Sequence, residues 1–203
     1  MRVGRRCSTT VILTAAVLMT MWVTGRRAAA RGLQASTSSH TQASQPAAAP
    51  AANPADVSSI DAILHAAYDT ISGPAGRRRD WDRFRSLFVS GARLAVVVPN
   101  HQGGFRTVVL SPEEYIQHDD PYFQNHGFFE REVARRTERF ADIAQVFSTY
   151  ESRHAADDAK PFERGINSFQ LMNDGRRWWI VTIFWQGETP EGPIPQEFLQ
   201  GVN

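Results

Sequence analysis

A tight turn near the end of the chain constrains its fold most strongly. Asn173-Asp174-Gly175 stands between two segments, 165–172 and 177–186, whose patterns predict strands. A short loop of Asn, Asp and Gly between two such runs is a strong local signal for an antiparallel hairpin. The second segment contains three Trp and is apolar on both of its alternating faces. One face should therefore pack under helices, and the other should line an interior or meet a second subunit.

The chain from Asp56 onward predicts helices first and long strands later. Apolar residues three and four apart predict a helix over 57–71, and Asp80 is a helix cap before the apolar residues of 81–88. Ser111-Pro112 predicts the start of a short helix, with a loop over 119–127. The other segments predict strands over 93–99, 105–110, 128–139, 143–153, 165–172 and 177–186. This order indicates an α+β fold, with helices on one face of a curved sheet.

The strand predicted over 128–139 carries charges on both of its alternating faces. Glu130 and Glu132 share one face, and Arg131 and Arg135 share the other. Such a strand fits a sheet that lines a polar cavity or a dimer contact, or else an exposed face with cross-strand ion pairs. A β-bulge would change which residues face inward, so alternation alone leaves that question open. The last segment, 190–203, contains three Pro and predicts an extended tail packed on the surface.

Composition excludes several classes of protein. The chain has 203 residues and a net charge of +1, but six of its 22 basic residues are arginines within the first 31 positions, which contain no acid. The remaining 16 basic and 21 acidic residues argue against nucleic-acid binding. The single cysteine, Cys7, lies in the N-terminal segment, so cysteine catalysis, disulfides and a Cys-ligated zinc site are excluded from the folded part. We predict no metal and no cofactor.

The N-terminal segment has the pattern of a secretory signal. Arg2, Arg5 and Arg6 precede an apolar run over 8–25, and small residues follow up to Ala30. We expect residues 1–30 to be a signal peptide and the protein to be exported, either periplasmic or secreted. An uncleaved membrane anchor is the alternative, because the run is near the lower limit for a membrane span. Residues 31–55 predict a disordered linker, and residues 56–203 a single folded domain.

Three segments carry a resemblance to a known family. Tyr68-Asp69 ends the first helix, Asp80 to Phe88 form the second, and Gln170 to Val181 contain the last hairpin. With this order of elements, the chain resembles the nuclear transport factor 2-like superfamily, and within it the SnoaL-like and scytalone dehydratase-like proteins. The resemblance implies a cone-shaped, strongly bent antiparallel sheet covered by about three N-terminal helices. The superfamily includes enzymes and proteins without known chemistry, so the fold alone does not define an activity.

The resemblance also implies catalytic candidates. Scytalone dehydratase-like members place a Tyr-Asp pair on the first helix and two histidines on the sheet. Tyr68, Asp69 and His126 match three of these positions, and an Asp-oriented imidazole can move a proton near neutral pH. The second histidine would fall on the strand 143–153, which contains none. This absence favours a binding protein over a dehydratase or isomerase.

The sequence is compatible with three functions. The first is an exported domain that binds a small apolar or carbonyl-containing molecule inside the cone. The second is a lyase or isomerase that uses Tyr68, Asp69 and His126. The third is a protein-association module that uses the outer sheet face, and we expect a homodimer through the sheet, with membrane contact only if the leader is retained. The candidate ligand-binding residues are Trp81, Tyr115, Phe128, Glu132, Ser148 and Tyr150.

Overall fold

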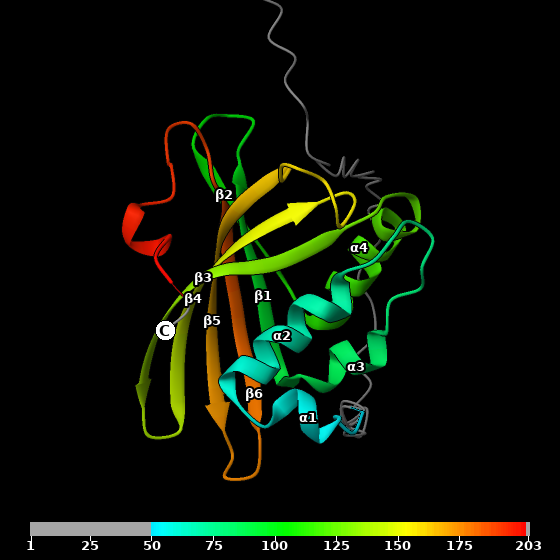
Figure 1. The fold of residues 1–203 in the computed structure, drawn as a ribbon, viewed down its shortest axis with the longest axis vertical. Helices are drawn as coiled ribbons and strands as arrows, with labels where there is room; N and C mark the ends of the chain where they lie inside the picture. The colour runs from blue at the N-terminus through cyan, green and yellow to red at the C-terminus, as the bar shows by residue number, and fades with distance from the viewer. Residues whose placement is uncertain (1–49, 202–203) are drawn as a thin grey trace, which may run out of the picture. The chain divides into compact units, whose positions relative to one another are not determined.

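The structure, a computed structural model, describes residues 50–201 (Figure 1). Its helices are α1 (Pro54–Val57), α2 (Ile60–Ile71), α3 (Trp81–Ser86), α4 (Pro112–Asn125) and the 3-10 helix η1 (Gln196–Phe198). Its strands are β1 (Phe88–Pro99), β2 (Phe105–Leu110), β3 (Phe129–Phe140), β4 (Ile143–Arg153), β5 (Glu163–Asn173) and β6 (Trp178–Gly187). The expected leader and most of the expected linker lie outside the described residues. Within residues 50–201, no helix has the length and apolar character needed to span a membrane.

The six strands form one sheet in the order β2-β1-β6-β5-β4-β3. All neighbours are antiparallel except β1 and β6, which are parallel. The sheet is strongly curved and does not close, and α2 lies against what we call its inner face, while the C-terminal segment lies on the opposite, outer face (Figure 1). The predicted α+β class is confirmed. The parallel pair was not predicted, because it joins segments far apart in sequence and leaves no turn signal.

Side-chain caps determine where the first helices begin. A single helix over 57–71 was predicted, but the helix is interrupted at Ser59, whose backbone is extended. The Ser59 hydroxyl accepts from the backbone N–H of Ala62 at 3.0 Å and so caps the start of α2. The predicted cap at Asp80 is confirmed, because its carboxylate accepts from the N–H of Arg83 at 2.9 Å. The helix that follows ends at Ser86, earlier than predicted, because Phe88 already pairs with Ile180 of β6.

Helix α4 is longer than predicted. Ser111 and Glu114 form the reciprocal capping box that stabilises its start. The helix then continues through Pro121 to Asn125, so the loop predicted over 119–127 is wrong. Ile116 and Phe123, two turns apart, are both buried in the core. Their packing holds both halves of the helix in place despite the hydrogen bond that a proline removes.

The end of α2 is closed by a buried arginine. Arg79 is 3% exposed, and its guanidinium donates to the backbone carbonyls of Ile71, Gly73, Pro74 and Arg77. Ile71 is the last residue of α2 and the other three carbonyls follow it, so Arg79 ties the end of the helix to the loop behind it. Gly73 also exchanges two backbone hydrogen bonds with Phe128. The end of α2 is thereby attached to the start of β3, which brings Tyr68 and Glu130 to one place.

A bulge in β3 decides which charges face inward. Glu132 is opposite Tyr150 and Ala134 is opposite Thr149, so Val133 is an extra residue between them. Glu130 and Glu132 therefore lie on the inner face, and beyond the bulge the inner face continues with Arg135. Arg136 and Glu138 are turned to the outer face. Simple alternation would have placed them on the same face as Glu130.

Candidate functional site

A polar cluster lies on the inner face of the sheet, between α2 and strands β3 to β5. We call it the inner polar cluster. It is surrounded by apolar core residues of the same face, including Val146, Phe169 and Leu171. Its members are Tyr68, Glu130, Glu132, Arg135, Ser148, Tyr150, Ser152, Glu163 and Asn167. Polar groups buried next to a core need internal partners, and the hydrogen bonds below supply them.

Glu130 is the carboxyl at the centre of this cluster. Its backbone N–H donates to the hydroxyl of Ser72, the residue that caps α2, at 3.0 Å. Its carboxylate accepts from the hydroxyl of Ser152 at 2.8 Å and from the amide of Asn167 at 3.2 Å. Burial raises the pKa of Glu130 from 4.5 to about 7, although the hydrogen bond from Ser152 opposes the shift, and nearby Glu163 raises it further.

Glu163 forms a second buried acid with Tyr150. The phenol of Tyr150 donates to its carboxylate at 3.0 Å. Burial raises the pKa of Glu163, against this hydrogen bond, and burial also raises the pKa of Tyr150. Within residues 50–201, neither Glu130 nor Glu163 forms an ion pair with a basic side chain.

Two glycines make room for this second acid. Gly165 of β5 lies opposite Gly187 of β6. A Cβ on Gly165 would lie 2.5 Å from the hydroxyl of Tyr150, and a Cβ on Gly187 would lie 2.7 Å from a carboxylate oxygen of Glu163. Both distances are too short for a real contact, so any side chain at these positions would displace the Tyr150–Glu163 pair.

Tyr68 connects the two ends of the cluster. The Ser148 hydroxyl donates to Glu132 at 2.6 Å, so its oxygen accepts the single hydrogen of Tyr68, also at 2.6 Å. The Asn167 amide donates to the Tyr68 oxygen at 3.2 Å. Burial raises the pKa of Tyr68, which therefore stays protonated.

Glu132 differs from the two other glutamates because it has a cationic partner. Arg135 donates to its carboxylate at 2.6 Å and also pairs with Asp61 at the start of α2. The Arg135 side chain is 7% exposed, so this ion pair is largely withdrawn from water. The cluster thus contains one charge-compensated acid and two acids held only by neutral donors.

The three predicted catalytic residues do not lie in one cluster. Asp69 pairs with Arg83 and its side chain is 53% exposed. His126 is exposed at the end of α4, where its ring stacks on Tyr122 and Nδ1 lies 3.1 Å from the Tyr122 carbonyl. Within residues 50–201, no hydrogen bond joins Asp69, His126 and Tyr68. Their joint catalytic role stays a prediction.

The predicted ligand-binding residues fall into two groups. Glu132, Ser148 and Tyr150 belong to the inner polar cluster. Trp81, Tyr115 and Phe128 form aromatic contacts: Trp81 and Tyr115 pack on Phe84, and Phe128 packs on Phe123. Trp81 also donates its ring N–H to Asp120 at 2.8 Å. Burial raises the pKa of Tyr115. Ligand binding by any of the six stays a prediction.

Five members of the cluster were not among the predicted site residues: Glu130, Arg135, Ser152, Glu163 and Asn167. Alternation on β4 places Ser148, Tyr150 and Ser152 on one face, which is a usable signal. The pairing of Glu130 with Asn167 spans 37 positions and has no local signal. A metal-binding group of three or more His, Cys, Asp or Glu side chains is absent from the described part of the chain.

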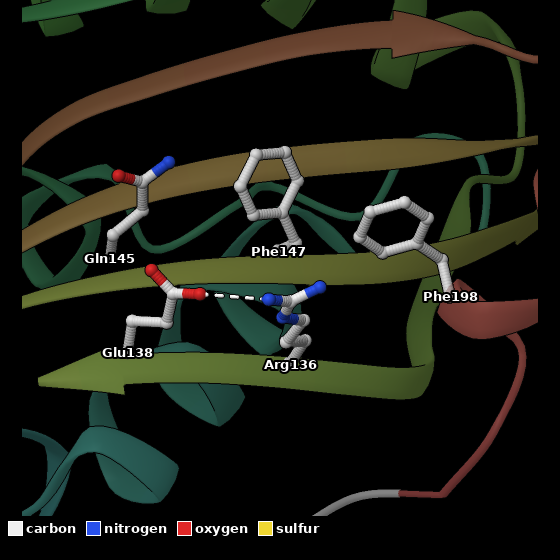
Figure 2. Close-up of a pocket in the computed structure, with 5 residues that line it drawn as sticks. All are labelled: Arg136, Glu138, Gln145, Phe147 and Phe198. Carbon is white, nitrogen blue, oxygen red and sulfur yellow. Dashed lines mark hydrogen bonds and ion pairs between the residues drawn. The ribbon is translucent and has the colours of Figure 1, made fainter.

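A separate pocket lies on the outer face, on the side of the sheet away from the cluster. Its volume is about 160 Å³. Figure 2 shows its lining residues, which come from β3, β4 and the C-terminal segment: Arg136, Glu138, Gln145, Phe147 and Phe198.

The fold and cluster describe a curved-sheet domain with buried acids on its inner face, consistent with a nuclear transport factor 2-like cone. No family model matches the sequence, and no curated protein matches it either.

Several solved structures align with the chain. A protein of unknown function with a cystatin-like fold from Nostoc punctiforme has a TM-score of 0.49 at 11% identity, over 64% of this chain and 90% of that one. A proposed dehydratase from the nuclear transport factor 2-like family of Streptomyces avermitilis has a TM-score of 0.48 at 13% identity, over 66% and 96%. A proposed ketosteroid isomerase from Parabacteroides distasonis has a TM-score of 0.44 at 11% identity, over 64% and 89%. We draw no activity from these likenesses.

Proposed function

We propose that the domain binds a small, partly apolar molecule with a carbonyl or hydroxyl group at the inner polar cluster. The observation that carries the proposal is that Glu130 and Glu163 are held only by neutral donors within residues 50–201, whereas Glu132 and Asp56 are paired with arginines. A buried carboxyl group without a cationic partner costs folding free energy, and such groups concentrate at functional sites.

The chemistry of the cluster supports this class of ligand. With a pKa of about 7, Glu130 is present in both protonation states near neutral pH. Its protonated form can donate to a carbonyl, and its ionised form can accept from a hydroxyl. Tyr115, Tyr122 and Phe128 are partly buried against the core and offer apolar contacts to the rest of a ligand. If the leader directs export, the ligand is met outside the cytoplasm.

The pKa of Glu130 favours a second candidate function, that of a dehydratase or isomerase. A general base works best when its pKa is close to the working pH. In a β-hydroxy ketone, Glu130 would remove the proton next to the carbonyl. The Glu163 carboxyl, once protonated, would give a proton to the departing hydroxyl, which leaves as water. This assignment replaces Asp69 and His126 by Glu130 and Glu163 as the proton-handling pair.

A single probe tests binding and catalysis together. We would titrate the protein with 3-hydroxycyclohexanone by ligand-observed NMR and follow the formation of 2-cyclohexenone by its ultraviolet absorption. We expect the wild type to bind the probe and Glu130→Gln to bind it with about tenfold lower affinity, because a hydrogen bond to a charged group contributes about that factor. Asp69→Asn is the matched control, because its carboxylate pairs with Arg83 away from the cluster.

Four outcomes of this experiment distinguish the proposals. Binding without turnover supports the binding protein, and turnover abolished by Glu130→Gln supports the enzyme. Loss of binding or turnover in Asp69→Asn and His126→Ala, with Glu130→Gln unaffected, would restore the catalytic set that the resemblance implies. Equal behaviour of wild type and all variants would refute a site at the cluster.

The outer face supports a third role, in protein association. Phe184 of β6 is 44% exposed on that face. A homodimer through the sheet, as the sequence predicts, would cover it.

A further inference from the structure

The C-terminal segment Ile194–Gly201, which we call the strap, covers one part of the outer face. Phe198 packs on Phe147 of β4, with ring centroids 5.5 Å apart. The carbonyl of Phe198 accepts from the hydroxyl of Thr149, and the carbonyl of Gly201 accepts from the N–H of Arg135 at 3.1 Å. Thr149 is 0% exposed although it faces outward, because the strap lies over it.

Within residues 50–201, one aromatic pair and two hydrogen bonds to strap carbonyls join the strap to β3 and β4. At its other end, the N–H of Ile194 donates to the Glu188 carboxylate at 2.9 Å. The outer pocket of about 160 Å³ remains between Phe198 and the two strands (Figure 2). This pocket is partly open to solvent, so the strap leaves the surface beside Phe198 incompletely covered. Such a segment can detach without unfolding the sheet.

The surface under the strap continues across the outer face as one row of paired residues. In register from β2 to β4, the row consists of Val109, Ala95, Phe184, Ser168 and Phe147. Val109 is 55% exposed and Phe184 is 44% exposed, while Phe147 lies against Phe198. The strap therefore covers only the β4 end of a largely apolar row.

Charges next to this row suit a second copy of the chain. Arg136 lies opposite Phe147, and Glu138 lies opposite Gln145, on the same outer face. The two charged groups pair with each other at 2.9 Å. In a two-fold contact the same surface meets itself, so Arg136 of one copy can meet Glu138 of the other. The apolar row and this self-complementary pair together fit sheet-on-sheet packing.

We propose that the strap competes with a second copy of this chain for the outer face of β3 and β4, and so limits self-association. This inference does not depend on the inner polar cluster. When the strap is displaced, Phe147 and Thr149 become accessible and two sheets can pack face to face. The strap is thus a built-in competitor of the dimer contact.

Sedimentation velocity tests the proposal. We would compare the full chain, a chain that ends at Gly192, and Phe198→Ala, with Glu197→Ala as the control because Glu197 is exposed on the strap. We expect both strap variants to dimerise with a dissociation constant at least about tenfold lower than that of the full chain, as loss of an aromatic contact of about 1.4 kcal/mol predicts. Glu197→Ala should behave like the full chain.

Charge reversal tests whether the partner is a second copy in the stated orientation. In the chain that ends at Gly192, Arg136→Glu should abolish the dimer, and Arg136→Glu combined with Glu138→Arg should restore it. The proposal is overturned if both strap variants stay as monomeric as the full chain. It is also overturned if association persists through the single reversal. If the shortened chain fails to fold, the same charge reversals are made in Phe198→Ala, and its dimerisation is measured in the same way.

Discussion

Glu130 is the residue on which the inner polar cluster depends. Its carboxyl contacts Ser152 and Asn167, and Ser72 fixes its backbone against the end of α2. Each of these partners is neutral, so nothing in the contact compensates a negative charge. The cluster therefore binds a proton more tightly than the unfolded chain does, and this difference makes its stability depend on pH.

The pH dependence can be predicted with its sign. The pKa of Glu130 is about 7 in the folded protein, against 4.5 ordinarily. Between these values the folded state holds a proton on Glu130 that the unfolded state has lost, so the contribution of Glu130 to stability falls as pH rises from about 4.5 to 7 and is then constant. Glu130→Gln should remove this contribution and be more stable than wild type at pH 8 by about 1–3 kcal/mol. Its slope should be shallower but not zero, because burial also raises the pKa of Glu163. Urea unfolding followed by Trp fluorescence from pH 5 to 8 measures it.

Glu132→Gln is the matched control for this experiment. Glu132 lies on the same face of the same strand, but it is paired with Arg135, whose side chain is 7% exposed. Its replacement leaves a largely buried guanidinium with only Asp61, so this variant should be less stable than wild type over the whole pH range. An unchanged slope in Glu130→Gln would contradict the assignment of the titration to this carboxyl.

At the scale of elements, backbone irregularities place the cluster. The bulge at Val133 turns Arg135 inward, where it reaches Glu132. The opposed glycines of β5 and β6 leave the space that Tyr150 and Glu163 occupy. Both features depend on pairing between strands, and a change in either should disturb the cluster without abolishing the sheet.

Gly165→Ala tests the glycine pair. The new Cβ would lie 2.4 Å from the carbonyl oxygen of Gln186 as well as against Tyr150. Backbone cannot move aside cheaply, so we expect a loss of at least about 1–3 kcal/mol in the free energy of unfolding. Urea unfolding measures this loss. Gly192→Ala is the control, since its Cβ would meet only the Thr189 hydroxyl at 3.4 Å. Equal stabilities of the two variants would show that the close approach at Gly165 is relaxed in solution.

At the scale of the whole molecule, the N-terminal segment carries a prediction about where the domain works. The arginines, apolar run and alanines of residues 1–30 predict cleavage near Ala30 and export. Intact-mass measurement on protein recovered from the secreted or periplasmic fraction should find a chain that begins close to Arg31. A full-length chain recovered from membranes would instead support the uncleaved anchor.

Much of the fold was predictable because its signals are local. The caps at Asp80 and Ser111, the Asn173-Asp174-Gly175 turn and the alternating strands are read from neighbouring residues. The length of α4 was not, because packing of Phe123 in the core overrides the proline before it. Tyr68 was singled out through a resemblance and its partner Ser148 was a candidate ligand-binding residue, but its partner Asn167 was not singled out.

The sequence by itself determined the class of the fold, the order of its elements and the presence of acids on a strand with two charged faces. Only the tertiary structure decided which acids lie inside and what they contact. The physical reason is distance along the chain: Tyr68 meets Ser148 and Asn167 across 80 and 99 positions. Local propensity and alternation carry no information about contacts of that kind. These contacts depend on the register of strands β3 to β6 and on the bulge at Val133. The register and the bulge form only when the strands pair in the folded sheet.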